Sequence, residues 1–190
     1  MQRLLRLLSI FMLCLSAQAG AATIVSGVTL PEKIHLDKSD LVLNGAGTRT
    51  KAIFNIYVAA LYLEKKTRSA EAVLSSSGTM RVELHVLYKL TAGDFMEAFN
   101  KAINDNHAPQ EYAPIAARLI HFSRAFRDVG EVDKGSVIVL DYIPGIGTIL
   151  TVNGKERQRI AGEDFYHAML KIWLGKKPVQ ESVKKALLGG

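Results

Sequence analysis

Cysteine is almost absent from this chain of 190 residues, which contains only Cys14, near the N-terminus. A disulfide within one chain needs two cysteines, so the fold must be stabilised by core packing alone. The sequence also lacks a run of about 20 apolar residues, the length that a membrane-spanning helix needs. We therefore expect no membrane span.

Residue patterns typical of metal sites and catalytic nucleophiles are missing as well. No two histidines have the i, i+4 spacing of a helical zinc site, no G-x-S-x-G elbow occurs, and the glycine pattern of a dinucleotide-binding turn is incomplete. A pair of catalytic carboxylates stays open, because such pairs form between segments distant in sequence. The basic residues are scattered, which argues against nucleic acid. We expect no metal, no cofactor, no nucleic-acid partner and a monomeric protein.

The N-terminal segment has the pattern of a secretory signal peptide. Arg3 and Arg6 form a positively charged start, an apolar run too short to span a membrane follows at residues 7–15, and Ala17-Gln18-Ala19 supplies a small-x-small cleavage pattern. Removal of the two arginines lowers the formal net charge from +6 to +4. A bacterial-type signal and the lack of disulfides predict an exported, periplasmic protein.

The domain organisation follows from this signal. We predict a signal peptide at residues 1–22, cleaved near residues 19–22, because Gly20-Ala21-Ala22 offers a second site. Residues 23–190 contain no linker and no internal repeat, and their number suits one domain. We therefore predict a single mature domain.

Apolar residues alternate or run continuously in seven segments that we predict to be strands, and they recur at helical spacing in five others. The expected strands come either before residue 90 or between residues 136 and 160, and helices follow each of these groups. Strands and helices grouped in this way indicate an α+β fold with a large antiparallel sheet covered by helices. The expected strands lie at residues 24–30, 41–43, 49–63, 79–88, 136–142, 148–152 and 155–160. The expected helices lie at residues 69–77, 91–103, 112–126, 162–174 and from residue 178 onward.

Arg49 is the strongest candidate for function. It lies among apolar residues in a stretch rich in strand formers, and a charge buried there needs a partner. That partner is either an internal carboxylate or an acidic ligand, which a guanidinium can hold through two hydrogen bonds. Tyr57 offers a third donor, while Phe95 and Phe99 form either core or the walls of an apolar pocket.

One geometric condition applies to this pair. On a single straight strand Arg49 and Tyr57 would lie about 27 Å apart. They can share a ligand only if the chain folds back between them. Residues 51–54 include no glycine or proline to indicate such a turn.

Two groups of motifs resemble the chalcone isomerase-like superfamily, in its bacterial exported branch. The first is Asn-Gly-Ala-Gly-Thr-Arg-Thr-Lys at residues 44–51, followed by Tyr-Val-Ala-Ala-Leu-Tyr-Leu at residues 57–63. The second includes Asp-Tyr-Ile-Pro-Gly at residues 141–145, Gly-Glu-Asp-Phe at residues 162–165 and Trp-Leu-Gly-Lys-Lys-Pro at residues 173–178. The resemblance implies an open-faced β-sandwich, in which a large antiparallel sheet carries a layer of helices on one face and a ligand cleft lies between them.

The resemblance also implies one of two functions. Plant relatives close a chalcone into a flavanone, whereas relatives without that activity bind fatty acids, with an arginine on the carboxylate. Arg49 matches the arginine shared by both groups. Tyr57 matches the tyrosine of the fatty-acid binders, where the enzyme has a threonine.

Two further donors of the enzyme are not matched. Its helical tyrosine and asparagine fall at Phe95 and Ala102, neither of which can donate a hydrogen bond. If the alignment shifts by one turn, Asn100 or Asn104 takes the place of a donor. The loss of two donors argues against efficient catalysis, because the reaction gains from donors placed where charge develops.

We therefore expect a non-catalytic protein that binds a fatty acid or similar apolar carboxylate through Arg49, Tyr57 and Phe95, and we assign no catalytic residue. One alternative is an intramolecular lyase, an isomerase of the chalcone–flavanone type. A second alternative is a structural or partner-binding envelope protein without a ligand.

Overall fold

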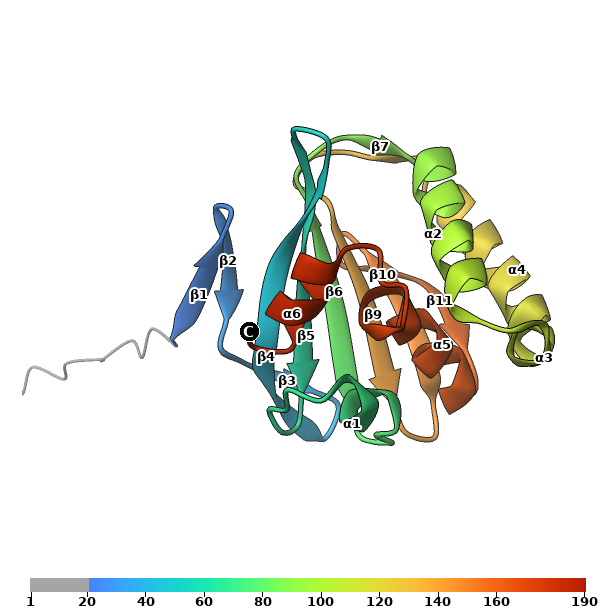
Figure 1. The fold of residues 1–190 in the computed structure, drawn as a ribbon, viewed down its shortest axis with the longest axis horizontal. Coiled ribbons are helices and arrows are strands. Elements are labelled where there is room, and N and C mark those ends of the chain that lie inside the picture. Colours follow the sequence, from blue (N-terminus) through green and yellow to red (C-terminus); the bar gives the residue numbers. More distant parts are fainter. Residues whose placement is uncertain (1–20) are drawn as a thin grey trace, which may run out of the picture.

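The computed structural model describes residues 21–190, so the expected signal peptide lies almost wholly outside the described residues. The fold is α+β, as the sequence predicts: a curled seven-stranded antiparallel sheet carries helices on one face (Figure 1). The strand order in this sheet is β11-β10-β9-β6-β5-β4-β3. None of the helices formed by residues 21–190 has both the length and the apolar character that a membrane crossing requires.

The elements follow the chain in this order. The strands of the first half are β1 (Ala22–Val25), β2 (Val28–Pro31), β3 (Lys33–Leu36), β4 (Ser39–Lys51), β5 (Phe54–Leu63), β6 (Met80–Val86) and β7 (Leu90–Thr91). Those of the second half are β8 (Glu131–Val132), β9 (Val137–Ile143), β10 (Gly147–Val152) and β11 (Lys155–Ile160). The helices are α1 (Ala70–Leu74), α2 (Ala92–Asn106), α3 (Pro109–Tyr112), the 3-10 helix η1 (Ala113–Ile115), α4 (Ala116–Arg127), α5 (Glu163–Leu174) and α6 (Glu181–Leu187).

The stretch around Arg49 is a hairpin, and the prediction of one continuous strand at residues 49–63 is wrong. Strand β4 ends at Lys51, the chain turns through Ala52 and Ile53, and β5 returns from Phe54, so that Arg49 pairs directly with Tyr57. Ala52 takes a φ of +53°, which glycine or asparagine would adopt more readily. The turn therefore carries no local sequence signal, and strand pairing imposes it.

Smaller differences have equally local causes. The expected first strand at residues 24–30 is the β1–β2 hairpin, which turns at Ser26 and Gly27, both with positive φ. The expected helix at residues 112–126 is divided into the end of α3, η1 and α4. Pro114 lies at that division, where its missing N–H and its ring interrupt a regular helix. The turn between the strands expected at residues 148–152 and 155–160 is of the type I′ that Asn-Gly favours, with φ of 50° at Asn153 and 74° at Gly154.

Both faces of the central strands are covered. The main core packs the helices on one face of the sheet. A second core lies on the other face and includes Leu43, Tyr62 and, from strand β2, Leu30. Helix α6 lies against β4 because Gly45 and Gly47 have no side chain there. A Cβ on Gly45 would lie 2.0 Å from the carbonyl oxygen of Ala186.

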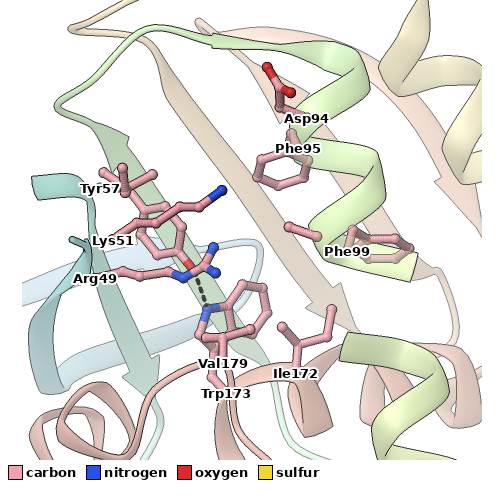
Figure 2. Close-up of a pocket in the computed structure, with 11 residues that line it drawn as sticks. Arg49, Lys51, Tyr57, Asp94, Phe95, Phe99, Ile172, Trp173 and Val179 are labelled. Atoms are coloured by element: carbon pink, nitrogen blue, oxygen red, sulfur yellow. Dashed lines mark hydrogen bonds between the residues drawn. The ribbon is translucent and has the colours of Figure 1, made fainter. Parts of the chain in front are cut away.

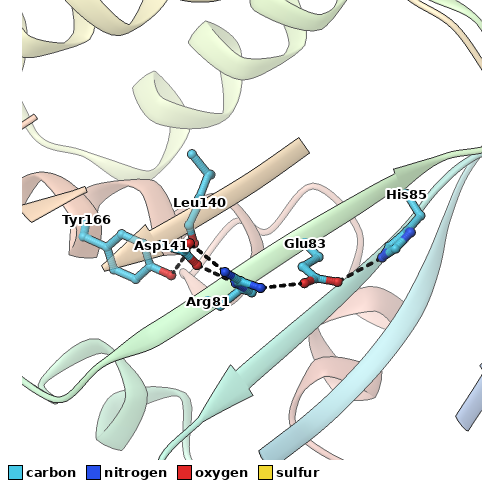
Figure 3. Close-up of polar contacts among 6 residues, drawn as sticks. All are labelled: Arg81, Glu83, His85, Leu140, Asp141 and Tyr166. Atoms are coloured by element: carbon cyan, nitrogen blue, oxygen red, sulfur yellow. Dashed lines mark hydrogen bonds and ion pairs between the residues drawn. The ribbon is translucent and has the colours of Figure 1, made fainter. Parts of the chain in front are cut away.

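A row of charged side chains crosses the face opposite the helices (Figure 3). Arg81 of β6 donates from Nε and Nη2 to both carboxylate oxygens of Asp141 on β9, at 2.5 and 2.8 Å. It also donates to Glu83, whose other oxygen lies 3.0 Å from Nε2 of His85. Burial lowers the pKa of Arg81, but the hydrogen bonds and charges of Asp141 and Glu83 outweigh burial and leave this pKa raised. His85 is thus a paired sheet residue.

Candidate functional site

A small pocket lies between the β4–β5 hairpin, α2 and the C-terminal half of α5 (Figure 2). It has a volume of about 80 Å³. The three residues expected to bind a ligand, Arg49, Tyr57 and Phe95, all line it. The remaining lining residues are Lys51, Ile56, Asp94, Ala98, Phe99, Ile172, Trp173 and Val179.

Arg49 enters the pocket from β4. Its guanidinium carbon lies 5.7 Å from the centroid of the Tyr57 ring, a contact that attracts the cation to the ring face. The side chain is half-buried, and its Nε is buried without a hydrogen-bond partner among the residues described. Within residues 21–190 no carboxylate forms an ion pair with Arg49. In the described part of the chain, Arg49 therefore does not form the internal salt bridge that was one of the two expected alternatives.

The hydroxyl group of Tyr57 is held in place by Trp173. Its side chain is 3% exposed, and its hydroxyl oxygen accepts a hydrogen bond of 3.1 Å from Nε1 of Trp173. Burial raises the pKa of Tyr57, although the charge of Arg49 and the hydrogen bond from Trp173 act against that rise. The phenol therefore keeps its proton at neutral pH. Because Trp173 occupies an acceptor position of the oxygen, the hydroxyl hydrogen is available to a ligand.

Trp173 is a site residue that the sequence assigns only to the core. Its position on the inward face of α5 is typical of packing, and its ring is indeed buried. A buried indole N–H needs a hydrogen-bond acceptor, however. This requirement is the only feature of the sequence that indicates a role for Trp173 beyond packing. The structure supplies the acceptor from a strand more than a hundred residues earlier, so the partner could not be read from local sequence.

The apolar wall is formed by α2, which begins at its cap Thr91. The hydroxyl oxygen of Thr91 accepts a hydrogen bond from the backbone N–H of Asp94 at 3.0 Å. Phe95 stacks on Phe126 of α4 with ring centroids 4.4 Å apart. Phe99 stacks in the same way on Phe122, at 5.0 Å. Phe95 and Phe99 line the pocket, and these two stacks hold their rings in its wall.

A polar groove of about 410 Å³ adjoins the pocket. The groove and the pocket share five lining residues, including Arg49. The Arg49 guanidinium therefore lies at the junction between the apolar pocket and the polar groove. Charged side chains of both signs line the groove: Lys51, Asp94, Glu97, Lys101, Asp105 and Lys177.

The donors that a chalcone-closing enzyme would need are not supplied from α2. Phe95 lines the pocket with an apolar ring, and Ala102 lines only the groove. Asn100 is exposed and is not among the lining residues of the pocket, and Asn104 belongs to a separate groove beside the end of α5. Neither asparagine therefore takes the place of the missing donor.

Comparison with solved structures shows a shared architecture. A fatty-acid binding protein of Arabidopsis thaliana superposes with a TM-score of 0.72, over 88% of this chain and 96% of that chain, at 16% sequence identity. At so low an identity the likeness shows the fold alone. No curated protein matches the sequence. A family model described as chalcone isomerase-like, however, matches residues 22–189, and the chain therefore belongs to the chalcone isomerase-like family.

Proposed function

We propose that this protein binds a small carboxylate with an apolar tail in the pocket headed by Arg49. One observation carries the proposal: the Arg49 guanidinium has no carboxylate partner among residues 21–190, and it lies beside the Tyr57 phenol at the end of an apolar pocket. A polar group that is buried and unpaired is costly in a native structure. A carboxylate from a ligand would remove that cost.

The expected contacts follow from the donors present. The guanidinium can donate two parallel hydrogen bonds to the carboxylate oxygens, and Tyr57 can donate a third. Trp173 holds the phenol in place for this purpose. Two cations, Arg49 and Lys51, face one anion, Asp94, around the pocket, which favours an acidic ligand.

The volume of the pocket limits the apolar tail. A cavity of about 150 Å³ is known to hold benzene, whereas this pocket offers about 80 Å³. Charged side chains of both signs line the adjoining groove and disfavour a hydrocarbon chain there. We therefore propose a short-chain acid as the preferred ligand. Longer fatty acids would need the Phe95–Phe126 and Phe99–Phe122 stacks to separate.

A thermal-shift series tests this proposal. Linear acids from butyrate to palmitate are compared with alcohols of the same chain length, and lipids extracted from the purified protein are identified by mass spectrometry. A ligand present at 100 times its Kd stabilises a protein by about 2.7 kcal/mol, roughly 5–10 °C in a domain of this size. We expect shifts from the short acids and none from the alcohols. If no acid shifts the melting temperature and no acid co-purifies, the binding proposal is wrong.

We also propose that the protein is exported and cleaved before Gly20. Strand β1 begins at Ala22, and the backbone N–H of Glu32 donates to the carbonyl oxygen of Ala21 at 2.9 Å. Cleavage after Ala19 preserves both features, whereas cleavage after Ala22 removes them. Intact-mass measurement of protein released from the periplasm is expected to give a chain starting at Gly20. Recovery of uncleaved protein from the cytoplasm would contradict export.

A further inference from the structure

Three large apolar side chains are exposed together at one end of the molecule. Ile53 is 88% exposed, Phe54 46% and Tyr88 45%. Ile53 lies in the turn of the β4–β5 hairpin, and Phe54 is the first residue of β5. This hairpin rises beyond the rest of the sheet, beside the segment leading into β7 (Figure 1). We call Ile53, Phe54 and Tyr88 the hairpin tip.

The turn beneath this tip does not have the residues that its geometry favours. Ala52 adopts a φ of +53°, which costs an L-residue energy that glycine avoids. The Asn153-Gly154 hairpin of the same chain uses the preferred polar and glycine residues for its turn. Places where a chain departs from local rules are often functional. An exposed Ile53 in such a turn points to an apolar contact outside the chain.

The tip is also held in a fixed shape. The rings of Phe54 and Tyr88 lie 4.9 Å apart between centroids. The backbone N–H groups of Leu87 and Tyr88 both donate to the carbonyl oxygen of Ile56, at 2.9 and 3.2 Å. The Tyr88 segment is thereby tied to β5, so the apolar surface exists before any partner arrives.

Lysines flank the tip. Lys51 directly precedes the turn and forms no ion pair with any residue in the described range 21–190, and Lys89 directly follows Tyr88. Lys89 pairs with Glu131 at 2.7 Å and lies 3.6 Å from Asp133. The charge of Lys89 is thus compensated, and Lys51 is the lysine beside the tip that has no ion pair within residues 21–190. Without the proposed signal peptide, which contains Arg3 and Arg6, the chain carries a formal charge of +4. Apolar and aromatic groups beside a cation are typical of segments that lie in the interface of an anionic lipid bilayer.

We propose that the hairpin tip docks onto the surface of a lipid bilayer that contains anionic lipids. A stable contact with another protein or a second copy buries about 1,200–2,000 Å² of complementary surface, which three side chains at a narrow tip do not offer. A bilayer needs no shape complementarity. Lys51, Ile56 and Tyr57, which line the pocket, adjoin the tip in sequence, so docking brings the pocket close to the membrane.

Vesicle flotation tests this proposal. The protein is mixed with vesicles of phosphatidylcholine alone or of phosphatidylcholine with phosphatidylglycerol, and the fraction that floats is measured. We expect the wild-type protein to float with the mixed vesicles and the Ile53→Ser/Phe54→Ser variant to partition at least roughly tenfold less, since the loss of two exposed apolar side chains removes the inserted surface. The matched control, Ile24→Ser/Ile120→Ser, removes two apolar side chains that are 71% and 56% exposed elsewhere. It should float like the wild type.

The outcomes separate docking from the pocket. Wild-type protein that stays unbound, or a tip variant that floats as well as the control, would overturn the proposal. A dimer in sedimentation that the tip variant dissociates would also overturn it and assign the tip to a second copy. The tip residues do not line the pocket, so the melting-temperature shift caused by acids in vesicle-free solution should persist in the tip variant. Failure of acid binding and failure of docking are thus read from different measurements.

Discussion

Replacing Arg49 with methionine is expected to weaken carboxylate binding by roughly thirtyfold or more, because truncating one partner of a buried charge pair costs about 2–5 kcal/mol. The same change is expected to raise the melting temperature of the ligand-free protein. Methionine fills a similar volume and removes the buried Nε that has no hydrogen-bond partner in residues 21–190. The lost contact with the Tyr57 ring offsets part of that gain.

The stabilisation should be about 1 kcal/mol, since an unsatisfied buried polar group costs about 1–3 kcal/mol and a cation–π contact contributes about 0.5–1 kcal/mol. In a domain of this size that corresponds to roughly 2–4 °C. Calorimetric titration with a short acid and a thermal melt without ligand measure the two effects separately. A substitution that weakens ligand binding but raises the stability of the free protein is typical of a residue retained for function.

Two variants serve as controls. Arg49→Lys keeps the charge but not the planar fork, so we expect binding between that of the wild type and that of Arg49→Met. Lys51→Met removes one positive charge from an exposed side chain of the same pocket and should have a much smaller effect. Unchanged binding in Arg49→Met would place the acid elsewhere. A large fall in its melting temperature would assign the guanidinium to structure.

Replacing Asp141 with asparagine is expected to lower the free energy of unfolding by about 3 kcal/mol, the lower end of the cost of breaking a buried ion pair. The Asp141 side chain is 8% exposed and that of Arg81 is 21% exposed, so water compensates only part of the loss. Asparagine keeps one oxygen that can accept from Arg81 but carries no charge, so Glu83, at 3.3 Å, would be the carboxylate still paired with Arg81. The melting temperature should fall by roughly 10 °C.

A double variant tests whether this loss of stability comes from leaving the charge of Arg81 without its Asp141 partner. The Arg81→Met/Asp141→Leu protein should recover at least half of the stability, because apolar side chains can replace a buried pair without leaving an unpaired ion. Glu83 keeps His85 as a partner in that variant. As a surface control, Glu156→Gln breaks the exposed pair with Arg159 and should leave the melting temperature unchanged. A double variant no more stable than Asp141→Asn would contradict the explanation.

Most of the fold was predictable from residue periodicity. Strands β6, β9, β10 and β11 and helices α2 and α5 lie within a few residues of their expected positions, because each buries one face or stripe that the apolar pattern marks. Ser69 and Thr91, the first residues of two expected helices, each cap their helix by accepting a backbone hydrogen bond, as serine and threonine favour. Periodicity failed at the turns of the β1–β2 and β4–β5 hairpins, where residues on both sides of a turn were predicted to form one strand.

The sequence by itself determined the family, the α+β architecture, and the choice of Arg49 as the residue whose charge needs a partner. These conclusions depend on motifs and on burial patterns that are local in the chain. Only the tertiary structure decided that Arg49 lies opposite Tyr57, that Trp173 holds the phenol, and that stacked phenylalanines line a small pocket. The physical reason is the turn at Ala52. Pairing between β4 and β5 imposes a backbone conformation that alanine does not favour, and no local pattern could have indicated it.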